Sequence, residues 1–224
     1  MDKIKFIKMN EWAILPEKNI LENREIYHGD DLRWIKNNRI KGACWPYKMA
    51  HDLGWIIKSP IDIQLEPVEE VQVQCEDYEL QELGAQLNID FWVRREKTFL
   101  GIKPDGWFRV HQAKVNGNWQ SLLIPNGEYT FEWRLGWGIK IPKDFVVMIL
   151  PVDGNDGFVV HPGILTEKSL DKFNEGLGFS LAFEPKKKTF IKRGTPLAKI
   201  IIFHNSALHL KSEKIEGVSN LEMV

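Results

Sequence analysis

The chain has 224 residues, 43% of them hydrophobic, and a formal net charge of −1 from 30 basic and 31 acidic side chains. This length suits one large domain with its own core, and scattered charges of both signs argue against a nucleic-acid partner. No apolar run approaches the ~20 residues that span a bilayer, and the start carries no secretory signal. We therefore expect a cytoplasmic protein with two reduced cysteines and no membrane contact.

The first 42 residues predict an irregular N-terminal wrap. Charged and apolar residues alternate imperfectly over residues 3–8, which predicts a short strand there. From residue 10 onward, prolines, glycines and asparagines interrupt any longer pattern.

Residues 43–66 predict a corner in which a short helix leads into a strand. Pro46 suits the first turn of a helix, and Gly54 suits its end. The following strand, over residues 55–65, contains Pro60, which marks an edge or a bulge because proline cannot donate to a strand ladder.

Residues 67–204 predict the β core, because apolar and polar residues alternate with period two between turn signals. A helix is predicted over residues 166–174, and a short acidic piece at 76–83 also looks helical. Residues 205–224 form a tail. The expected strands lie near residues 71–75, 87–93, 107–115, 129–139, 145–152, 158–160, 179–183, 190–192 and 197–203.

The fold class that follows is mainly β. We expect a single domain over residues 1–224, built as a sandwich or distorted barrel of about ten strands with two short helices, at 46–53 and 166–174.

Aromatic side chains are abundant, with nine tryptophans in the chain. Such residues line a groove or an oligomer interface in some proteins and form a thick core in others. The candidate residues for a ligand pocket or interface are Trp45, Tyr47, Trp55, Trp133, Arg134 and Trp137.

Arg134 differs from its neighbours because it points away from the face that Trp133 and Trp137 share on a strand. Gly136 and Gly138 follow on the same side as Arg134 and leave room for a ligand or for a closely packed backbone. Arg134 then either binds an anionic group bidentately or is a surface arginine beside a bulge.

Histidine side chains are candidate metal ligands. His28 and Asp30 match the His-x-Asp half of a facial triad that binds Fe(II), with His161 or His204 as the third ligand. The alternative for the pair is an ordinary surface turn. We predict no metal and no cofactor.

Cys44 is a candidate nucleophile. Cys44 would lie at a helix N-terminus, where a thiolate is favoured, but His51 would lie about two turns away, too far to act as its base. Asp153 and Asp156 are explained by a glycine-rich turn, and the lysines at 186–188 by a solvated turn between strands.

Two blocks of the sequence resemble a β-rich family of unknown function from bacterial and phage genomes. The first is C-W-P-Y-x-x-A-x-x-x-G-W-x-x-x-S-P-x-D, from Cys44 to Asp62, and the second is Gly194-Thr195-Pro196-Leu197. This resemblance implies a shared fold and brings no activity with it.

The C-terminal half resembles the β-barrel of the trimeric dUTPases and dCTP deaminases in the order of its strands, which run from the 145–150 segment to Gly194-Thr195-Pro196 and the last strand. That family carries Arg-Ser-Ser after the first of these strands, where this chain has Pro151, Val152 and Asp153. Lys199 stands where the family commonly carries Gln. The resemblance therefore implies a barrel topology and none of the family's phosphate-binding or catalytic groups.

The function predicted from these patterns is a non-catalytic binding or assembly protein, a possible homo-oligomer whose partner is an unknown small molecule or protein. The alternative is an enzyme, either an Fe(II)-dependent β-roll oxygenase or a diverged nucleotide hydrolase.

Overall fold

The computed structural model describes residues 3–18, 45–74, 79–89, 91–96, 98–102, 112–115 and 117–214. The N-terminal wrap beyond residue 18, with His28 and Asp30, lies outside the described residues, as does Cys44. Among the helices of the described part, none is long and apolar enough to cross a membrane.

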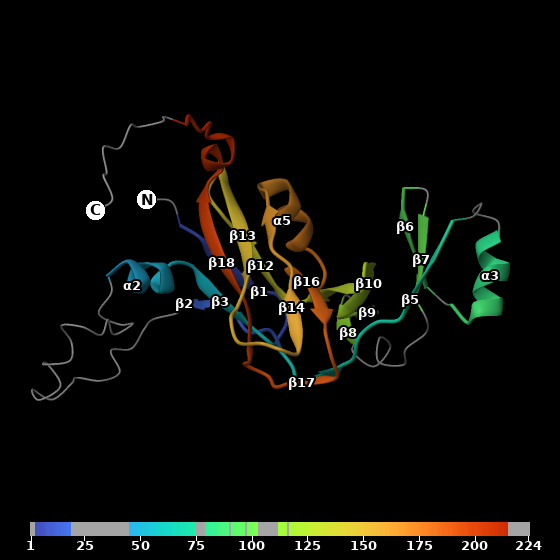
Figure 1. Cartoon of the computed structure of the whole chain (residues 1–224). Coiled ribbons are helices and arrows are strands. Elements are labelled where there is room, and N and C mark those ends of the chain that lie inside the picture. Colours follow the sequence, from blue (N-terminus) through green and yellow to red (C-terminus); the bar gives the residue numbers. More distant parts are fainter. Residues whose placement is uncertain are drawn as a thin grey trace, which may run out of the picture.

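A five-stranded antiparallel sheet forms one side of the body (Figure 1). Its longest ladder joins β13 to β18, and β3 pairs with the other edge of β18. The strands in sheet order are β15 Gly163–Leu165, β13 Phe145–Pro151, β18 Pro196–His204, β3 Trp55–Lys58 and β2 Glu17–Lys18.

A four-stranded antiparallel sheet supplies much of the remaining core. Its strands in order are β10 Leu123–Gly127, β11 Thr130–Arg134, β16 Ser180–Pro185 and β14 Phe158–Val160. Two strand pairs complete the body, β1 Lys5–Lys8 with β12 Trp137–Lys140 and β4 Ile63–Leu65 with β17 Thr189–Ile191.

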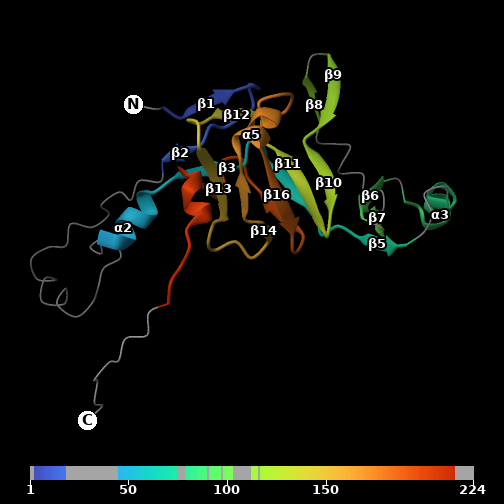
Figure 2. The same cartoon turned by 90° about the horizontal axis from the view of Figure 1, so that it is seen from above.

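The helices lie around these sheets. Helix α2 extends from one side of the body, and a three-stranded sheet with α3 extends from the opposite side (Figures 1 and 2). The remaining elements are α2 Trp45–Asp52, α3 Leu80–Leu87, α5 Glu167–Phe173, η3 Asn205–His209, β5 Glu70–Val73, β6 Phe91–Arg95, β7 Thr98–Ile102, β8 Gln112–Val115 and β9 Asn118–Ser121.

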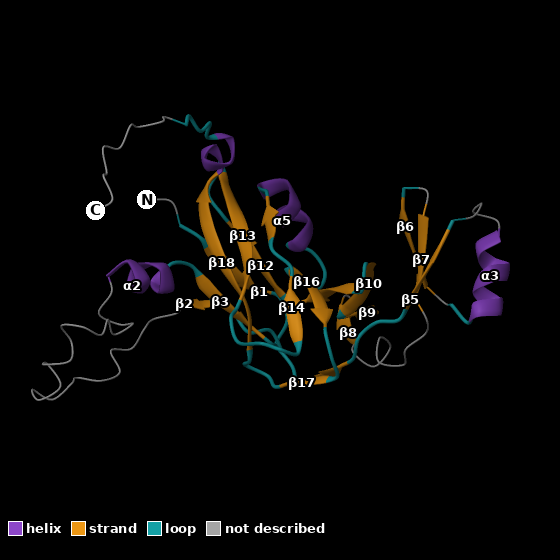
Figure 3. Cartoon of the chain, in the orientation of Figure 1, coloured by secondary structure: helices purple, strands orange, loops and turns teal. Residues whose placement is uncertain are grey.

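Strands predominate over helices throughout (Figure 3), which confirms the predicted mainly β class. The face that Trp133 and Trp137 were predicted to share lies in the core, where Trp133, Leu135 and Trp137 have 0% exposure. Trp137 stacks on Phe179 with ring centroids 4.4 Å apart. The single-domain organisation stays a prediction.

The predicted corner is present, with α2 running into β3. Gly54 between them has φ +86°, and a Cβ there would lie 2.1 Å from the carbonyl oxygen of Ile200 on β18. Only glycine permits this close approach and this backbone conformation. The predicted 55–65 strand is divided at Ser59 and Pro60 into β3 and β4, which join different sheets.

Two other predicted elements differ from the structure. The 129–139 strand breaks after Arg134, and its second half becomes β12, which leaves the four-stranded sheet to pair with β1. The helix expected at 76–83 is instead α3, which extends to Leu87 and ends at Asn88 in the left-handed conformation. The strand predicted at residues 87–93 therefore begins later than expected, because Leu87 belongs to α3 and β6 spans Phe91–Arg95.

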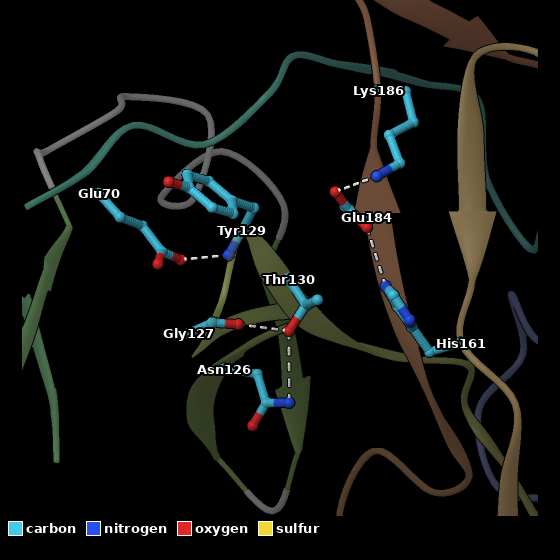
Figure 4. Close-up of polar contacts among 8 residues, drawn as sticks. All are labelled: Glu70, Asn126, Gly127, Tyr129, Thr130, His161, Glu184 and Lys186. Carbon is cyan, nitrogen blue, oxygen red and sulfur yellow. Dashed lines mark hydrogen bonds and ion pairs between the residues drawn. The ribbon is translucent and has the colours of Figure 1, made fainter. Parts of the chain in front are cut away.

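The turn between β10 and β11 contacts the three-stranded sheet through a hydrogen bond (Figure 4). Thr130 Oγ1 donates to the carbonyl oxygen of Gly127 at 2.7 Å, which closes the turn between the two strands. The backbone N–H of Tyr129 donates to Glu70 Oε1 on β5 at 2.7 Å.

Candidate functional site

A cavity of about 460 Å³ lies on the five-stranded sheet, and we call it the lysine cavity. Lys199 on β18 and Glu17 on β2 are both register partners of Ile56 on β3, so these three side chains form a row on one face of the sheet. The alternate residues Ile57, Ala198 and Ile200 are fully buried in the core. The cavity is lined by Glu17, Lys18, His51, Ile56, Lys58, Pro151, Val152, Asp153, Pro196 and Lys199.

Lys199 is held at the C-terminal end of α2. Its Nζ donates to the carbonyl oxygens of Ala50 at 2.7 Å and His51 at 3.0 Å, where the helix dipole favours a cation. Burial lowers the pKa of Lys199, and the positive charge of Lys18 lowers it further, while Asp52 opposes the change. A group that shares its cavity with a second cation and is partly desolvated gains from a bound anion.

The other two lysines lie on the neighbouring strands. Lys18 Nζ lies 3.9 Å from the centroid of the Trp55 ring, a cation–π contact. Lys58 Nζ lies 2.5 Å from Glu17 Oε2, so one lysine is already neutralised. None of the described residues forms an ion pair with Asp153, the second carboxylate of the cavity.

The two places where the chain departs from the dUTPase-like motifs lie side by side. Strand register pairs Leu150 with Lys199 and Pro151 with Ala198. Pro151, Val152, Asp153 and Lys199 consequently line the same cavity. Lysines on three strands surround these four residues, so the surface there is charged rather than apolar.

A second cavity of about 440 Å³ lies against the four-stranded sheet, and it contains the predicted Arg134. Arg134 Nε lies 3.3 Å from Glu132 Oε1 two residues earlier on β11. We call it the arginine cavity, and it is lined by Gln120, Glu132, Arg134, Lys172, Phe173, Glu175, Gly176, Leu177 and Gly178.

Among the other predicted site residues whose side chains the structure describes, none lines either cavity. Trp133 and Trp137 are fully buried in the core. Trp55 packs edge-on against Phe6, with ring centroids 5.6 Å apart, and contacts the lysine cavity through Lys18. Trp45 and Tyr47 belong to α2, and their side chains lie outside the described part of the structure. A ligand-binding role for these aromatic residues stays a prediction.

The space beside Arg134 that two glycines were expected to leave open is filled by protein. A Cβ on Gly136 would lie 2.6 Å from the Trp12 ring, and one on Gly138 would lie 2.4 Å from Asn174 Oδ1. The neighbouring atoms belong to side chains, so neither a ligand nor a closely packed backbone, the two predicted alternatives, explains these glycines.

His161 and His204, the described histidines among the candidate iron ligands, each contact neighbouring residues. His161 Nε2 lies 2.9 Å from Glu184 Oε2, and Lys186 Nζ lies 2.5 Å from the other oxygen of the same carboxylate (Figure 4). His204 Nδ1 accepts from the backbone N–H of Ser206 and caps η3. The described residues contain no group of three or more potential metal ligands.

The lysines were missed because nothing in the local sequence connects them. Lys18, Lys58 and Lys199 are separated by 40 and more residues and come together only through the pairing of β2, β3 and β18. The available signal was Lys199 itself, an ionisable side chain within an apolar strand.

No family model and no curated protein matches this chain. Solved structures similar to it include the dUTPase from phage phi11 of S. aureus, at 11% identity and a TM-score of 0.40 over 99% of both chains. A point variant of the phage 80alpha dUTPase gives 10% identity and a TM-score of 0.40 over the full length of both chains. A Staphylococcus bacteriophage 80alpha dUTPase variant with dUpNHpp gives 10% identity and a TM-score of 0.39 over 100% of this chain and 92% of that one.

These similarities correct the predicted function. The main prediction, a non-catalytic binding or assembly protein, is wrong, because the similar solved structures are those of enzymes and agree better with the alternative of a nucleotide hydrolase. Identity near one tenth with these TM-scores assigns neither a family nor the role of any residue. The family of unknown function is not among the matches.

Proposed function

We propose that this chain hydrolyses a nucleotide whose phosphate groups bind in the lysine cavity. The observation that carries the proposal is the convergence of Lys18, Lys58 and Lys199 from three neighbouring strands around one cavity of about 460 Å³. Lysines outnumber carboxylates there, and ammonium groups are common phosphate ligands in proteins. A cavity of this volume accommodates a small-molecule ligand.

The partly desolvated Lys199 supports an anionic ligand. Burial and the nearby Lys18 both disfavour its charged form. A bound phosphate group would offset this repulsion, and the ammonium groups would compensate the charge that develops on a leaving phosphate.

Asp153 is the carboxylate that we assign to the attacking water. Glu17 is bonded to Lys58, whereas Asp153 follows the end of β13 at the cavity wall with no ion-pair partner among the described residues. In the proposed reaction, water attacks a phosphorus atom and passes its proton to Asp153. The P–O bond to the leaving phosphate breaks, and that group keeps the electron pair.

The experiment measures binding and turnover separately with a panel of ribo- and deoxyribonucleoside triphosphates, dUTP included. Calorimetry gives affinity, and release of phosphate or pyrophosphate with Mg²⁺ present gives turnover. We expect Lys199→Met to weaken binding about tenfold, which corresponds to a loss of about 1.4 kcal/mol of charge attraction. Asp153→Asn should keep the affinity and reduce turnover by about 100-fold or more.

Lys143→Met is the matched control, because Lys143 is exposed in the loop between β12 and β13 and lines neither cavity. Absence of binding by every triphosphate would overturn the proposed site. Binding without turnover, or turnover unaffected in Asp153→Asn, would overturn the proposed reaction. The predicted homo-oligomer is a separate proposal, which sedimentation of the purified chain would test.

A further inference from the structure

The arginine cavity lies where small side chains on β16 and glycines after α5 leave space. Glu132 and Arg134 point outward from β11, opposite Ala182 and Ser180 on β16, whose small side chains cover little of the sheet. The cavity's opposite wall is the turn after α5, where Gly176 and Gly178 flank the buried Leu177. Gln120 on β9 and the half-buried Phe173 complete the lining.

The charges around this cavity come in equal numbers of each sign. Arg134 and Lys172 are cationic, and Glu132 and Glu175 are anionic. This arrangement differs from the lysine cavity, where cations are in excess. Because cations do not exceed carboxylates here, this lining attracts a polyphosphate less strongly than the lysine cavity does.

Charged groups of both signs remain available to a ligand in this cavity. Arg134 contacts Glu132 through Nε, and no described residue bonds to its two Nη atoms, which form the edge that binds a carboxylate bidentately. Lys172 and Glu175 form no ion pair with any described residue. Phe173 offers an apolar wall beside these charges.

We propose that the arginine cavity binds a small zwitterion of the free amino-acid type. Arg134 and Lys172 hold its carboxylate, Glu175 accepts hydrogen bonds from its ammonium group, and Phe173 contacts its side chain. Glu175 has the ammonium role because Glu132 is already bonded to Arg134. The proposal does not depend on nucleotide hydrolysis, since the two cavities share no residue and lie on different sheets.

The test uses the full chain and the twenty free L-amino acids as probes. A thermal-shift screen selects the best binder, and calorimetry measures its affinity. We expect Arg134→Gln to weaken that affinity about tenfold or more, because a charge-assisted bidentate contact is lost. The binder's N-acetyl derivative, which has no ammonium group, should bind wild type about tenfold more weakly, and Glu175→Gln should not weaken the derivative further.

Lys143→Gln is the control here, because it removes one positive charge outside the cavity. Arg134→Gln must unfold at the wild-type urea midpoint, so that a loss of affinity does not reflect a loss of stability. No binding by any amino acid would overturn the proposal. Unchanged affinity in Arg134→Gln, or equal affinity for the N-acetyl derivative, would overturn it too. Saturating tripolyphosphate should leave amino-acid binding intact, so failure of one site is distinguishable from failure of the other.

Discussion

The side chain of Asn174 takes the place of a neighbouring strand for β12, which makes it the most informative residue to change. Its Oδ1 accepts from the backbone N–H of Ile139 at 2.8 Å, and its Nδ2 donates to the carbonyl oxygen of Ile139 at 3.0 Å. Ile139 is fully buried, so both backbone groups would lose their partner in surroundings with little water. This contact also anchors the turn that leads from α5 to the arginine cavity.

We predict that Asn174→Ala lowers the free energy of unfolding by about 2–4 kcal/mol, because two hydrogen bonds of ~1 kcal/mol are lost and their buried backbone partners stay unsatisfied. For a chain of this size, that corresponds to a fall in Tm of roughly 5–12 °C. Urea unfolding followed by tryptophan fluorescence measures the change directly.

Gly138 provides a second route to the same contact. A Cβ at this position would lie 2.4 Å from Asn174 Oδ1, so Gly138→Ala displaces the asparagine side chain. Once Asn174 is alanine, much of that clash disappears. The two substitutions together should therefore cost at least ~1 kcal/mol less than the sum of the single changes.

Gly163→Ala is the control for this cycle, because Gly163 lies in a strand and a Cβ there would meet nothing within 4 Å. It should change stability by less than ~0.5 kcal/mol. The reasoning is refuted if Asn174→Ala is equally mild, or if the costs of the Gly138 and Asn174 substitutions simply add.

Two further predictions concern the corner and the His161 cluster. Gly54→Ala should cost at least about 3 kcal/mol in urea unfolding, since a left-handed backbone and a clash with the Ile200 carbonyl combine; a cost below ~1 kcal/mol would contradict the close approach. Burial raises the pKa of Glu184, but hydrogen bonds from Lys186 and His161 outweigh it and lower the pKa below 4.5. The stability advantage of wild type over Glu184→Gln should thus be complete above pH 4.5 and disappear as pH falls through the folded-state pKa, and an advantage that persists unchanged in acid would count against this cause.

Local patterns in the sequence were sufficient for the class of fold and for several of its elements. Pro46 and Gly54 predicted α2 closely, and the segment 166–174 predicted α5. The alternation placed Trp133 and Trp137 on one shared face, and the structure shows that this face is buried. These predictions succeeded because capping residues and hydrophobic periodicity act within a few residues of each other.

Among the predicted site residues whose side chains the structure describes, Arg134 lines a cavity. Its direction, away from the face of Trp133 and Trp137, followed from the same alternation. The cavity itself did not follow from sequence. Its walls come from β9, β11 and the turn after α5, and the predicted open space beside Gly136 and Gly138 is occupied by Trp12 and Asn174.

The sequence alone therefore determined a mainly β chain, the face that Trp133 and Trp137 share and the opposite direction of Arg134, because period-two alternation is a local property. That the shared face is buried came from the structure. Tertiary structure alone decided that Lys18, Lys58 and Lys199 surround one cavity. It also decided that Asn174 completes β12. Both outcomes depend on strand order and register between distant segments, which no local pattern specifies.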